Sequence, residues 1–533
     1  MNYAVSFLSA LRREFKHYSP QFFSKDLLSG LTVAAVALPL ALAFGISSGM
    51  DGASGMITAI IAGLVIGLFG GASYQISGPT GAMAAILIGL AARSGPQGVF
   101  IAGFLSGIIL LILAVLRVGA LVSYIPRAVI TGFTSGIAVI IALGQIDNFF
   151  GVQSQGESAL MRLASYTQLG FSVHLPSLFY GLLVVLLMLF WPKSFNARFP
   201  ASLLGIIVCL LLQSVLALDV PVVGAIPKTL VSSERLQLLK LQPMALLPYL
   251  SPALSIAALG MVESLLCGAS AGKMKKEKLD ATQELFAQGL GNVLIPFFGG
   301  IPATAAIART SVAIKSGQQT RLTSIIHALG LLASMFLLSP FMSRIPLSAL
   351  GGVLLVTAWR MNEHEAIAQM FRCRIKTSIA QFLITMIATV VFDLTIAILI
   401  GILFSMIMFI IKSHKISIRV DQVKDAQKLT FVVYVDGSLF FGSQDQLTKT
   451  TQKLITEGVQ HIIFSLRGVP TIDHSSIEEF LEIRQMLEEK QVSLWFCGLQ
   501  APVQSMMQRL GFIELVGEEN LYPSAVVALQ ALR

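Results

Sequence analysis

The chain has few charged residues for its length. Only 12% of its 533 residues are Asp, Glu, Lys or Arg, whereas a soluble protein has about 25%. The deficit is confined to residues 27–411, which are nearly all apolar, while residues 412–533 have an ordinary soluble composition. A single soluble globule is therefore excluded. The sequence predicts one large membrane domain followed by one small soluble domain.

Cysteine and histidine are also scarce, with four and seven residues. The cysteines lie far apart without metal-ligand spacing, which predicts neither a disulfide nor a structural metal: Cys209, Cys267, Cys373 and Cys497. The histidines are scattered, and the sequence has no Ser-His-Asp arrangement or other enzyme motif. We therefore expect a protein that is not an enzyme and needs no cofactor.

No secretory signal peptide precedes the first long apolar run. Residues 1–25 are charged and amphipathic without a cleavage site, which predicts a cytoplasmic N-terminal segment. The net charge of +9 does not indicate nucleic acid binding, because the basic residues are scattered over short loops between apolar runs. Such residues act as topology signals. We expect membrane lipid, and no nucleic acid, as a partner.

Apolar runs recur about fourteen times, in two sets of about seven. The first set covers about 26–218 and the second about 249–412; the spans lie at about 26–47, 53–70, 76–92, 97–116, 124–145, 176–191, 200–218, 249–270, 282–298, 302–315, 320–340, 345–359, 375–391 and 394–412. Basic residues follow the even-numbered spans, for example Arg117 after the fourth and Lys273 after the eighth, which places the N-terminus in the cytoplasm. Because seven is odd, the second set enters from the opposite side and forms an inverted repeat.

Two segments at matching positions in the two sets are broken by glycine and proline. In the tenth span, within Gly291–Lys315, the break at Phe298–Pro302 precedes a helix expected over about 303–314. In the third span, Ser77-Gly-Pro-Thr80 precedes a helix over about 80–92. Each helix is about 18 Å long and covers roughly half of a ~30 Å hydrocarbon core. Such half-helices direct positive N-termini at the bilayer midplane and predict an anion site; two merely kinked helices are the alternative.

Arg309 is the main candidate for anion binding, because arginine is always charged and offers several donors. We place it about two turns into the tenth half-helix. Small or hydroxyl neighbours would leave room for the anion or donate to it: Ala308, Thr310, Thr304 and Ser311 in the tenth span, and Thr80, Gly81 and Ala82 in the third. A structural arginine and close packing of small residues are the alternatives. Pro39 predicts a third break, after which Phe44 either lines the cavity or packs.

Glu263 is a second candidate, because it lies in the apolar eighth span without a neighbouring charge. An intramembrane carboxylate is a functional hypothesis by default. Glu263 could hold a proton until it is released, or it could bind a cation. The alternative is a structural ion pair with Arg309 across the site.

The soluble tail has a different periodicity. Buried strands are predicted at Leu429–Val435, His461–Leu466 and Val492–Cys497, and helices near 444–456, 475–489, 501–509 and 524–532. Alternating strands and helices predict a small α/β domain. The domains are therefore expected at 1–25, 26–414 and 415–533.

These residues resemble the SulP anion permeases, the bacterial relatives of the animal sulfate/chloride/bicarbonate exchangers. The resemblance covers nearly the whole chain and rests on Pro39–Phe44, Ser77–Thr80, Glu263–Leu266, Gln288–Asn292, Phe298–Pro302 and Ala308–Thr310. The tail resembles a STAS domain, with Arg467–Ser476 at its hallmark turn. The resemblance implies a polytopic α-helical homodimer of the bacterial inner membrane with a cytoplasmic STAS domain. It also implies an anion between the third and tenth half-helices, and an elevator motion of the core spans.

Several positions depart from the family pattern. Leu40 and Ala308 stand where many members have a polar residue. In sodium-coupled bicarbonate members, an Asp and a Thr four residues later resemble the sodium ligands; here the pair is Glu263 and Cys267. Since a thiol is a poor ligand for a hard cation, the pair favours protons over sodium as the coupling ion.

In stand-alone STAS proteins, the serine that corresponds to Ser475 can be phosphorylated. The resemblance therefore implies a regulatory phosphosite and a cytoplasmic protein partner of the STAS domain. A helix N-cap formed by Asp473 through Ser476 is the alternative.

The sequence thus predicts a secondary active transporter of a small anion, namely a dicarboxylate, bicarbonate or sulfate, coupled to protons through Glu263. A sodium-coupled bicarbonate symporter and an uncoupled anion channel or exchanger are the main alternatives. A regulatory membrane scaffold that acts through its STAS domain is a further one.

Overall fold

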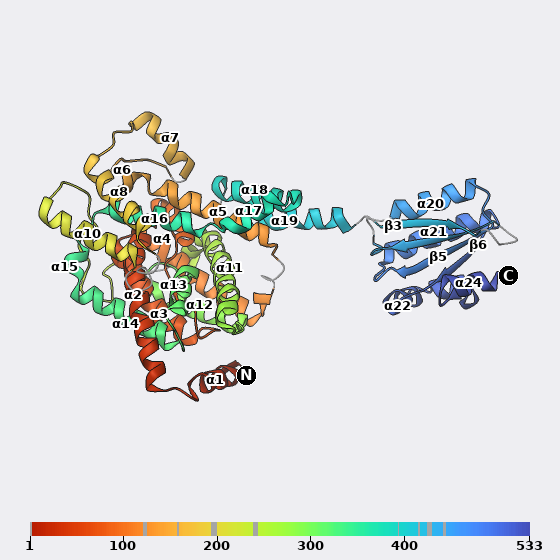
Figure 1. Cartoon of the computed structure of the whole chain (residues 1–533), viewed down its shortest axis with the longest axis horizontal. Helices are drawn as coiled ribbons and strands as arrows, with labels where there is room; N and C mark the ends of the chain where they lie inside the picture. Colours follow the sequence, from red (N-terminus) through yellow and green to blue (C-terminus); the bar gives the residue numbers. More distant parts are fainter. Residues whose placement is uncertain are drawn as a thin grey trace. The chain divides into compact units, whose positions relative to one another are not determined.

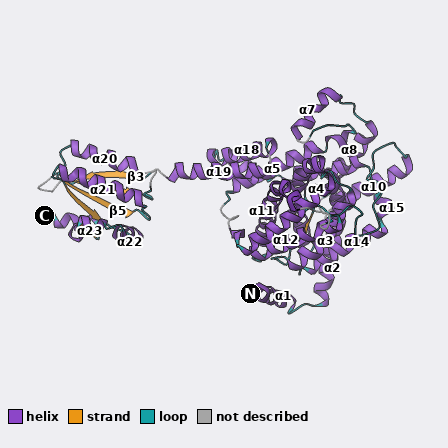
Figure 2. Cartoon of the chain, turned by 180° about the vertical axis from the view of Figure 1, so that it is seen from behind, coloured by secondary structure: helices purple, strands orange, loops and turns teal. Residues whose placement is uncertain are grey.

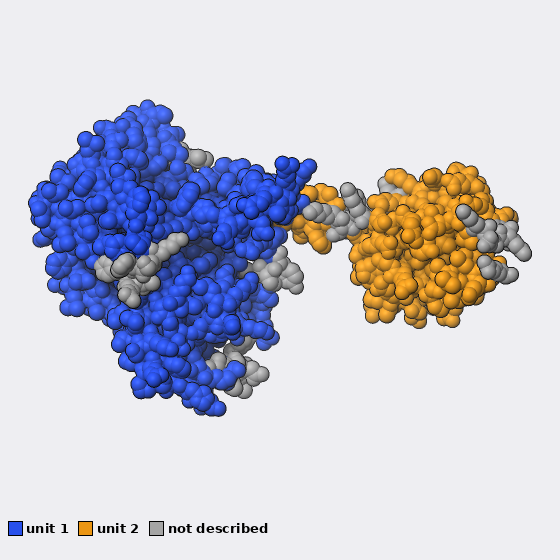
Figure 3. Space-filling model, in the orientation of Figure 1, with its two compact units in different colours: residues 1–402 blue, residues 403–533 orange. Residues whose placement is uncertain are grey.

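The computed structural model describes residues 3–120, 125–156, 159–192, 200–237, 243–392, 394–413, 416–423, 429–440 and 444–532. The chain divides into two compact units, residues 1–402 and 403–533 (Figure 3). The division falls within the helix α19 (Leu394–Ser413), about a dozen residues before the boundary predicted at 414. Figure 2 shows that the first unit is built of helices and the second around a sheet.

A helix occupies each of the fourteen predicted segments. They are α2 (Pro20–Ser47), α3 (Gly52–Phe69), α4 (Gly81–Val115), which covers the third and fourth segments, α5 (Arg127–Gly144), α8 (Leu175–Phe190), α10 (Ala201–Leu216), α11 (Leu250–Lys275), α12 (Ala281–Phe298), α13 (Ile307–Lys315), α14 (Leu322–Leu337), α16 (Leu347–Met361), α18 (Lys376–Val391) and α19. Shorter helices connect them: α1 (Tyr3–Phe15), α6 (Ile146–Phe150), α7 (Ala159–Leu169), α15 (Ser339–Met342), α17 (His364–Arg372) and the 3₁₀ helix η3 (Pro243–Tyr249).

Five helical stretches among the described residues are long and apolar enough to cross a membrane: Pro20–Ser47, Gly52–Phe69, Gly81–Val115, Arg127–Phe150 and Leu246–Lys275. Other apolar helices are shorter. The helical class of the fold agrees with the prediction, whereas the number of spans stays a prediction.

Helix α4 is two helices joined at a kink. Gly95 has φ 63° and ψ −171° and is followed by Pro96. Glycine adopts positive φ without steric cost, and proline removes a backbone donor. The kink therefore separates the third segment, which begins at Gly81, from the fourth. The predicted short helix after the Gly-Pro break is present.

The break predicted at Pro39 is wrong. Helix α2 continues through Pro39 to Ser47, and the residues on both sides of Pro39 are buried. A proline removes one backbone hydrogen bond, but neighbouring helices can support a membrane helix across it. The same helix begins earlier than predicted, because Ser19 caps it by accepting a hydrogen bond from the Phe22 amide and Pro20 occupies its first position.

Two short strands meet inside the helical unit. Strand β1 (Ser77–Gly78) pairs antiparallel with β2 (Thr304–Ala305), with Ser77 opposite Ala305 and Gly78 opposite Thr304. Each strand leads into one of the predicted half-helices, α4 and α13. The predicted start of the tenth half-helix near residue 303 is wrong, because the chain is extended there and α13 begins at Ile307. Arg309 therefore lies in its first turn and not about two turns in.

The helices of the first unit pack in two groups. Helices α2, α3, α4, α11, α12, α13 and α14 pack mainly on one another, and so do α5, α8, α16 and α18. Helix α4 packs against α11, α12 and α5 and lies in the interior of the unit (Figure 1). The strands β1 and β2 belong to the first group, which we call the core group.

The second unit has a five-stranded sheet in the order β3 (Ser417–Gln422), β4 (Thr430–Asp436), β5 (His461–Gly468), β6 (Ser493–Cys497) and β7 (Leu521–Tyr522). Strand β3 is antiparallel to β4, and the other pairs are parallel. The helices are α20 (Gln444–Thr456), α21 (His474–Glu489), α22 (Ala501–Arg509), α23 (Phe512–Val516) and α24 (Ala525–Ala531). The predicted α/β domain is thus present. Strand β3 was not predicted, because its side chains are largely exposed and form no apolar run.

The Asp26 carboxylate connects α2 to the loop that follows α13. Asp26 is fully buried and accepts hydrogen bonds from the Gln319 amide at 2.6 Å, the Thr320 amide at 3.1 Å, and the Thr320 and Thr323 hydroxyls at 2.6 and 2.8 Å. The Tyr18 hydroxyl donates to it at 3.1 Å. The carboxylate therefore holds two parts of the core group together.

We expect Asp26→Asn to lower the free energy of unfolding by about 2–3 kcal/mol, because the loss of the negative charge weakens every hydrogen bond that the carboxylate accepts, and the amide nitrogen would face the Thr320 and Tyr18 hydroxyls, which now donate to Oδ2. Denaturation of the purified protein in detergent measures this effect. The matched control is Asp51→Asn at the exposed N-cap of α3, which should cost about 1 kcal/mol or less. Equal losses for the two variants would contradict the role assigned to Asp26.

Candidate functional site

The site is built where the two half-helices begin. Thr80 caps α4, and its hydroxyl accepts a hydrogen bond from the Met83 amide at 3.4 Å. Helix α13 begins after Ala306 without a side-chain cap. The first amides of a helix have no intrahelical partner and carry a partial positive charge. Because β1 and β2 pair directly before these helices, two positive helix ends start from the same small sheet.

Side chains of the neighbouring helices hold the two strands in place. The Ala305 amide donates to Ser264 Oγ (3.2 Å), and Gln288 Nε2 donates to Ser77 Oγ (3.0 Å). Asn292 makes two hydrogen bonds to the backbone of Ala303: Oδ1 accepts from the amide (2.7 Å) and Nδ2 donates to the carbonyl (2.9 Å). The Ile76 amide donates to Thr310 Oγ1 (3.0 Å). Gln288 and Asn292 belong to a motif of the predicted resemblance, but the sequence did not predict their contacts. Ser264 lies in the Glu263–Leu266 motif of the resemblance, and its contact was not predicted either.

Arg309 joins the two halves of the site. Its side chain is 1% exposed, and Nη2 donates to the Pro79 carbonyl, directly before the cap of α4, at 2.5 Å. Nη1 is buried without a hydrogen-bond partner among the described residues, and no carboxylate of the described chain forms an ion pair with it. The guanidinium thus places a positive charge without an ion-pair partner among the described residues where β1 ends.

Only glycine allows this approach of the guanidinium to β1. A Cβ atom at Gly78 would lie 2.4 Å from Arg309 Nη1. Such a distance is far below a van der Waals contact, so a side chain at Gly78 would displace the guanidinium. The Gly-Pro pair that signalled a helix break therefore also makes room for the charge.

Glu263 reaches both half-helix segments from α11. Its Oε2 accepts hydrogen bonds from the Thr80 hydroxyl at 3.0 Å and the Thr304 hydroxyl at 2.8 Å. Glu263 is partly exposed, whereas Thr80 and Thr304 are buried. The described structure shows no ion pair between Glu263 and Arg309, which was the alternative interpretation. The hydrogen bond between Thr304 and Glu263 was not predicted, because the two residues are 41 positions apart in the sequence.

Cys267 and Thr310 contact each other behind the strands. Cys267 Sγ donates to Thr310 Oγ1 at 3.5 Å, and both residues are fully buried. The Thr310 hydroxyl also accepts from the Ile76 amide. Thr310 thus binds the backbone of Ile76, directly before β1, and Cys267 binds Thr310. Among the described residues, no group of three or more His, Cys, Asp or Glu side chains could hold a metal ion.

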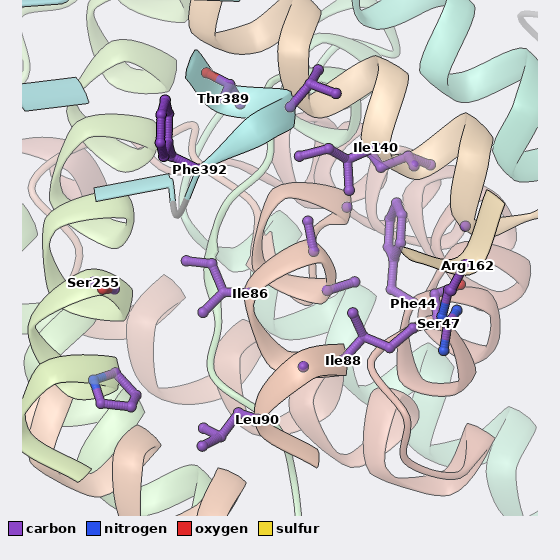
Figure 4. Close-up of a pocket in the computed structure, with 18 of the residues that line it drawn as sticks. Phe44, Ser47, Ile86, Ile88, Leu90, Ile140, Arg162, Ser255, Thr389 and Phe392 are labelled. Carbon is purple, nitrogen blue, oxygen red and sulfur yellow. The ribbon is translucent and has the colours of Figure 1, made fainter. Parts of the chain in front are cut away.

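Phe44 and Gly81 line a cavity of about 350 Å³ in the first unit (Figure 4). A Cβ atom at Gly81 would lie 3.1 Å from Phe44 Cε1, so these two predicted residues are neighbours. The other predicted residues are not among the described residues that line this cavity. Ala82 is buried, and Ala308 is exposed.

A buried carboxylate on α12 was not predicted. Glu284 is fully buried; its Oε2 accepts from the Gly71 amide and its Oε1 from Gln288 Nε2, both at 2.9 Å. Glu284 therefore orients the amide that binds Ser77 in β1. The sequence could have indicated the contact between Glu284 and Gln288, because the two residues are four positions apart and therefore lie on the same face of a helix.

Ser475 lies at the start of α21 in the second unit. Asp473 caps this helix, and its Oδ1 accepts hydrogen bonds from the Ser476 amide at 2.9 Å and the Ser476 hydroxyl at 2.8 Å. Ser476 is buried and Ser475 is partly exposed. The N-cap that was the alternative interpretation is therefore present, and Ser475 beside it is partly exposed.

Comparison with known proteins identifies both units. The sulfate permease family model matches residues 23–388, and the STAS domain model matches residues 418–528. A protein of Bacillus subtilis (strain 168) named "Putative sulfate transporter YvdB" is 32% identical over 524 residues, which cover 95% of this chain and 97% of the relative. "Bicarbonate transporter BicA" of Picosynechococcus sp. is 25% identical over 540 residues, which cover 95% and 94%.

A solved structure, that of SLC26A9, has the same fold. It superposes with a TM-score of 0.84 at 16% identity and covers 97% of this chain and 91% of its own. The predicted resemblance and the predicted combination of a helical membrane fold with a STAS domain are confirmed. The chain belongs to the sulfate permease family and is an anion transporter, not an enzyme.

Proposed function

We propose that the chain is a secondary active transporter that moves a small anion together with a proton carried by Glu263. The observation that carries the proposal is the position of Glu263, which accepts hydrogen bonds from Thr80 and Thr304, one from each half-helix segment. A carboxylate in this position lies between the two half-helix segments that begin at the strand pair. Its protonation therefore changes the net charge of the anion site.

The charges of the site make proton and anion binding favour each other. With Glu263 ionised, its negative charge offsets that of Arg309. When Oε1, the oxygen that accepts neither threonine hydroxyl, takes a proton, the positive charge of Arg309 and the helix ends is left to attract an anion. Coupling of this kind is reciprocal: the bound anion also favours the protonated carboxyl group. The result is symport of an anion with a proton.

The motion we propose is an elevator motion of the core group. The group contains β1, β2, Glu263 and Arg309, and its helices pack mainly on one another. A rigid group can carry the site past the other helices without breaking the hydrogen bonds around the strands. Inverted repeats with discontinuous helices commonly support alternating access of this kind.

Bicarbonate, sulfate and dicarboxylates are the substrates that we propose to test. One relative is named "Bicarbonate transporter BicA" and another "Putative sulfate transporter YvdB". Sodium coupling is the second candidate. It is less favoured because Cys267, at one of the two matching positions, donates to Thr310, and a thiol is a poor ligand for a hard cation.

Uptake of a labelled panel into proteoliposomes tests the proposal. Bicarbonate, sulfate and succinate would each be offered with an imposed pH gradient, with an imposed sodium gradient, and with choline replacing sodium. We expect accumulation of at least one anion with an inwardly directed proton gradient alone. A strict sodium requirement would indicate the sodium symporter, and flux that follows only the anion gradient would indicate a channel or exchanger.

We further propose that the protein is a homodimer of the bacterial inner membrane, with its N-terminus and STAS domain in the cytoplasm. Regulation would act through a cytoplasmic protein that binds the STAS domain, with Ser475 as a phosphosite. Ser475 supports this proposal because it is partly exposed at the start of α21.

Cys373 allows a direct test of this topology. It is exposed, while Cys209, Cys267 and Cys497 are buried; burial also raises the pKa of the Cys497 thiol, which suppresses the reactive thiolate. Because Cys373 follows the predicted twelfth span, we expect a membrane-impermeant maleimide to label inside-out vesicles and not right-side-out ones. Cys373→Ser is the control, and labelling of right-side-out vesicles alone would reverse the topology.

A further inference from the structure

We infer that a groove between the end of α11 and the start of α12 binds the phosphate headgroup of an anionic phospholipid. The groove has a volume of about 600 Å³. Its walls come from the C-terminal part of α11, the loop at residues 276–279, the first residue of α12 and residues 119–120 beyond α4. We call it the lysine groove, after Lys273, Lys276 and Lys278, which line it. Helices α11 and α12 are neighbours in the core group (Figure 1).

The chain reverses at the end of α11 and so brings the three lysines together. Lys276 ends the helix in the left-handed conformation, with φ 58°. A Cβ atom at Gly272 would lie only 2.6 Å from the Glu277 carbonyl oxygen, far below a van der Waals contact, so glycine allows the loop to lie against the helix. As a result, Lys276 and Lys278 line the same groove as Lys273, although the helix has ended between them.

The charge of the lysine groove is positive. All three lysines are exposed, and their side chains form no hydrogen bond or ion pair with a residue that the structure describes. Glu277 is the one acidic residue among the described lining residues, and Ser73 engages both of its oxygens: Oε1 accepts from the amide at 3.1 Å and Oε2 from the hydroxyl at 2.6 Å. Lys275 has a structural contact, since its Nζ donates to the Gln318 carbonyl. The groove therefore offers three ammonium groups to an anion.

The position of the lysine groove places these charges at the height of lipid headgroups. The apolar stretch Leu246–Lys275, which is long enough to cross a membrane, ends at the lysines. Headgroups form a layer roughly 5–8 Å thick on each side of the hydrocarbon core. By the predicted topology the loop lies on the cytoplasmic side, where anionic lipids give the membrane a negative surface potential that attracts lysine. The three ammonium groups thus face a layer that contains lipid phosphates.

The rest of the lysine groove is apolar. Leu265 and Leu266 line it from α11, and Leu279 lines it from the loop and packs against Gly268, where a Cβ atom would lie 2.5 Å from Leu279 Cδ2. The leucines of α11 precede Lys273 by eight and seven residues, or about 10–12 Å along the helix. A free phosphate fills the space of two or three waters, about 60–90 Å³, and gains nothing from this wall. A phospholipid fits both parts, with its phosphate at the lysines and the start of an acyl chain along the leucines.

The test is a lipid titration of the full chain in a neutral detergent, followed by native mass spectrometry. The probes are phosphatidylglycerol, phosphatidylcholine with identical acyl chains, and inorganic phosphate. We expect phosphatidylglycerol to bind about 100-fold more tightly than phosphatidylcholine, because each of three lysines near an anionic headgroup contributes about fivefold. Inorganic phosphate should not displace the lipid. Equal binding of the two lipids overturns the inference, and displacement by phosphate would overturn it by identifying a soluble anion as the ligand.

Removal of charge assigns the binding to the lysine groove. The preference for phosphatidylglycerol should be lost when three substitutions are combined: Lys273→Gln, Lys276→Gln and Lys278→Gln. The matched control combines Arg372→Gln, Arg374→Gln and Lys376→Gln. These three cations are also exposed and follow the predicted twelfth span on the same side of the membrane, but they do not line the groove, so the preference should persist. Equal losses in the two triple variants would reduce the lysines to general topology signals and overturn the inference.

A second pair of variants tests the groove without a change of charge. Ala269 lines the lysine groove and is exposed, whereas Ser270 is exposed beside it and does not line the groove. Ala269→Trp fills the groove and should weaken phosphatidylglycerol binding by about tenfold or more, which corresponds to about two methylenes that lose their contacts. Ser270→Trp should leave binding unchanged. Wild-type binding by Ala269→Trp overturns the inference, and so does a change of oligomeric state in this variant, which would place a second copy of the chain in the groove.

This inference is separate from the proposed function. Neither Glu263 nor Arg309 lines the lysine groove, so Glu263→Gln and Arg309→Ala should bind phosphatidylglycerol as the wild type does. Loss of lipid binding in Arg309→Ala would place the phosphate at the anion site and contradict the inference. Thermal denaturation of each variant checks its fold. Failure of proton-driven uptake would overturn the proposed function and leave the lipid-binding result unaffected.

Discussion

Arg309→Ala is expected to weaken anion binding by roughly 30- to 4,000-fold, the range that corresponds to about 2–5 kcal/mol for removal of one partner of a buried charged contact. The guanidinium is 1% exposed, and one of its nitrogens is buried without a protein partner. A buried positive charge of this kind is stabilised by a bound anion. Without the Arg309 guanidinium, the two helix ends alone would attract the anion. Binding of labelled sulfate and bicarbonate to the purified protein measures the change.

Two variants separate the role of the guanidinium from that of charge alone. Arg309→Lys keeps the charge but loses the planar pair of donors, so we expect a loss intermediate between wild type and Arg309→Ala. Lys315→Ala removes an exposed cation from the last turn of the same helix and should leave binding unchanged. Unchanged anion binding in Arg309→Ala, with the protein still monodisperse, would reject Arg309 as the main positive charge of the site.

The positions of the helices follow from the sequence because a bilayer constrains them strongly. A spanning helix must satisfy its backbone internally and expose apolar side chains to lipid, so its extent appears directly as an apolar run. The prediction was wrong at Pro39, where the helix continues, and near residue 303, where the chain is extended. Both errors concern backbone geometry within a buried region, where proline alone does not decide between a kink and a break.

The paired strands could not be predicted in the same way. Each of them has only two residues, too few to show a period of two, and their partners are far apart in sequence. Their pairing depends on three side chains of neighbouring helices: Ser264 accepts from the Ala305 amide, Gln288 donates to the Ser77 hydroxyl, and Asn292 accepts from the amide of Ala303, directly before β2. Such contacts arise from tertiary packing. The inverted repeat indicated which segments would be neighbours, but it could not provide these hydrogen bonds.

The charged residues of the site could be predicted, because charge inside an apolar run is rare and costly. Arg309 and Glu263 were found in this way, and the structure brings both to the strand pair. What the sequence could not show is how they are connected. The Thr80 hydroxyl reaches Glu263 across 183 residues of sequence, and the space beside Gly78 that admits the guanidinium is a property of the folded chain.

Glu263→Gln is expected to uncouple transport from the proton gradient while preserving anion binding. The glutamine carbonyl can still accept from Thr80 and Thr304, so the variant imitates the protonated carboxyl group and keeps the site positively charged. In the wild type, lowering the external pH protonates Glu263 and should increase uptake by up to roughly tenfold per pH unit, the limit for one linked proton. In Glu263→Gln, uptake should become independent of pH, and anion exchange between the two sides should persist.

The measurement is uptake into proteoliposomes with and without an imposed pH gradient, together with counterflow of a preloaded anion. Glu277→Gln is the matched control: Glu277 lies just beyond the end of α11 and binds Ser73, away from Thr80 and Thr304, so coupling should survive its substitution. A pH dependence of wild-type size in Glu263→Gln would assign the proton to another residue. Residue 263 is neutral both in the protonated wild type and in Glu263→Gln, so the positive charge on Arg309 should be the same in the two. Loss of anion binding in this variant would therefore show that Glu263 contributes to the anion site as a charged group.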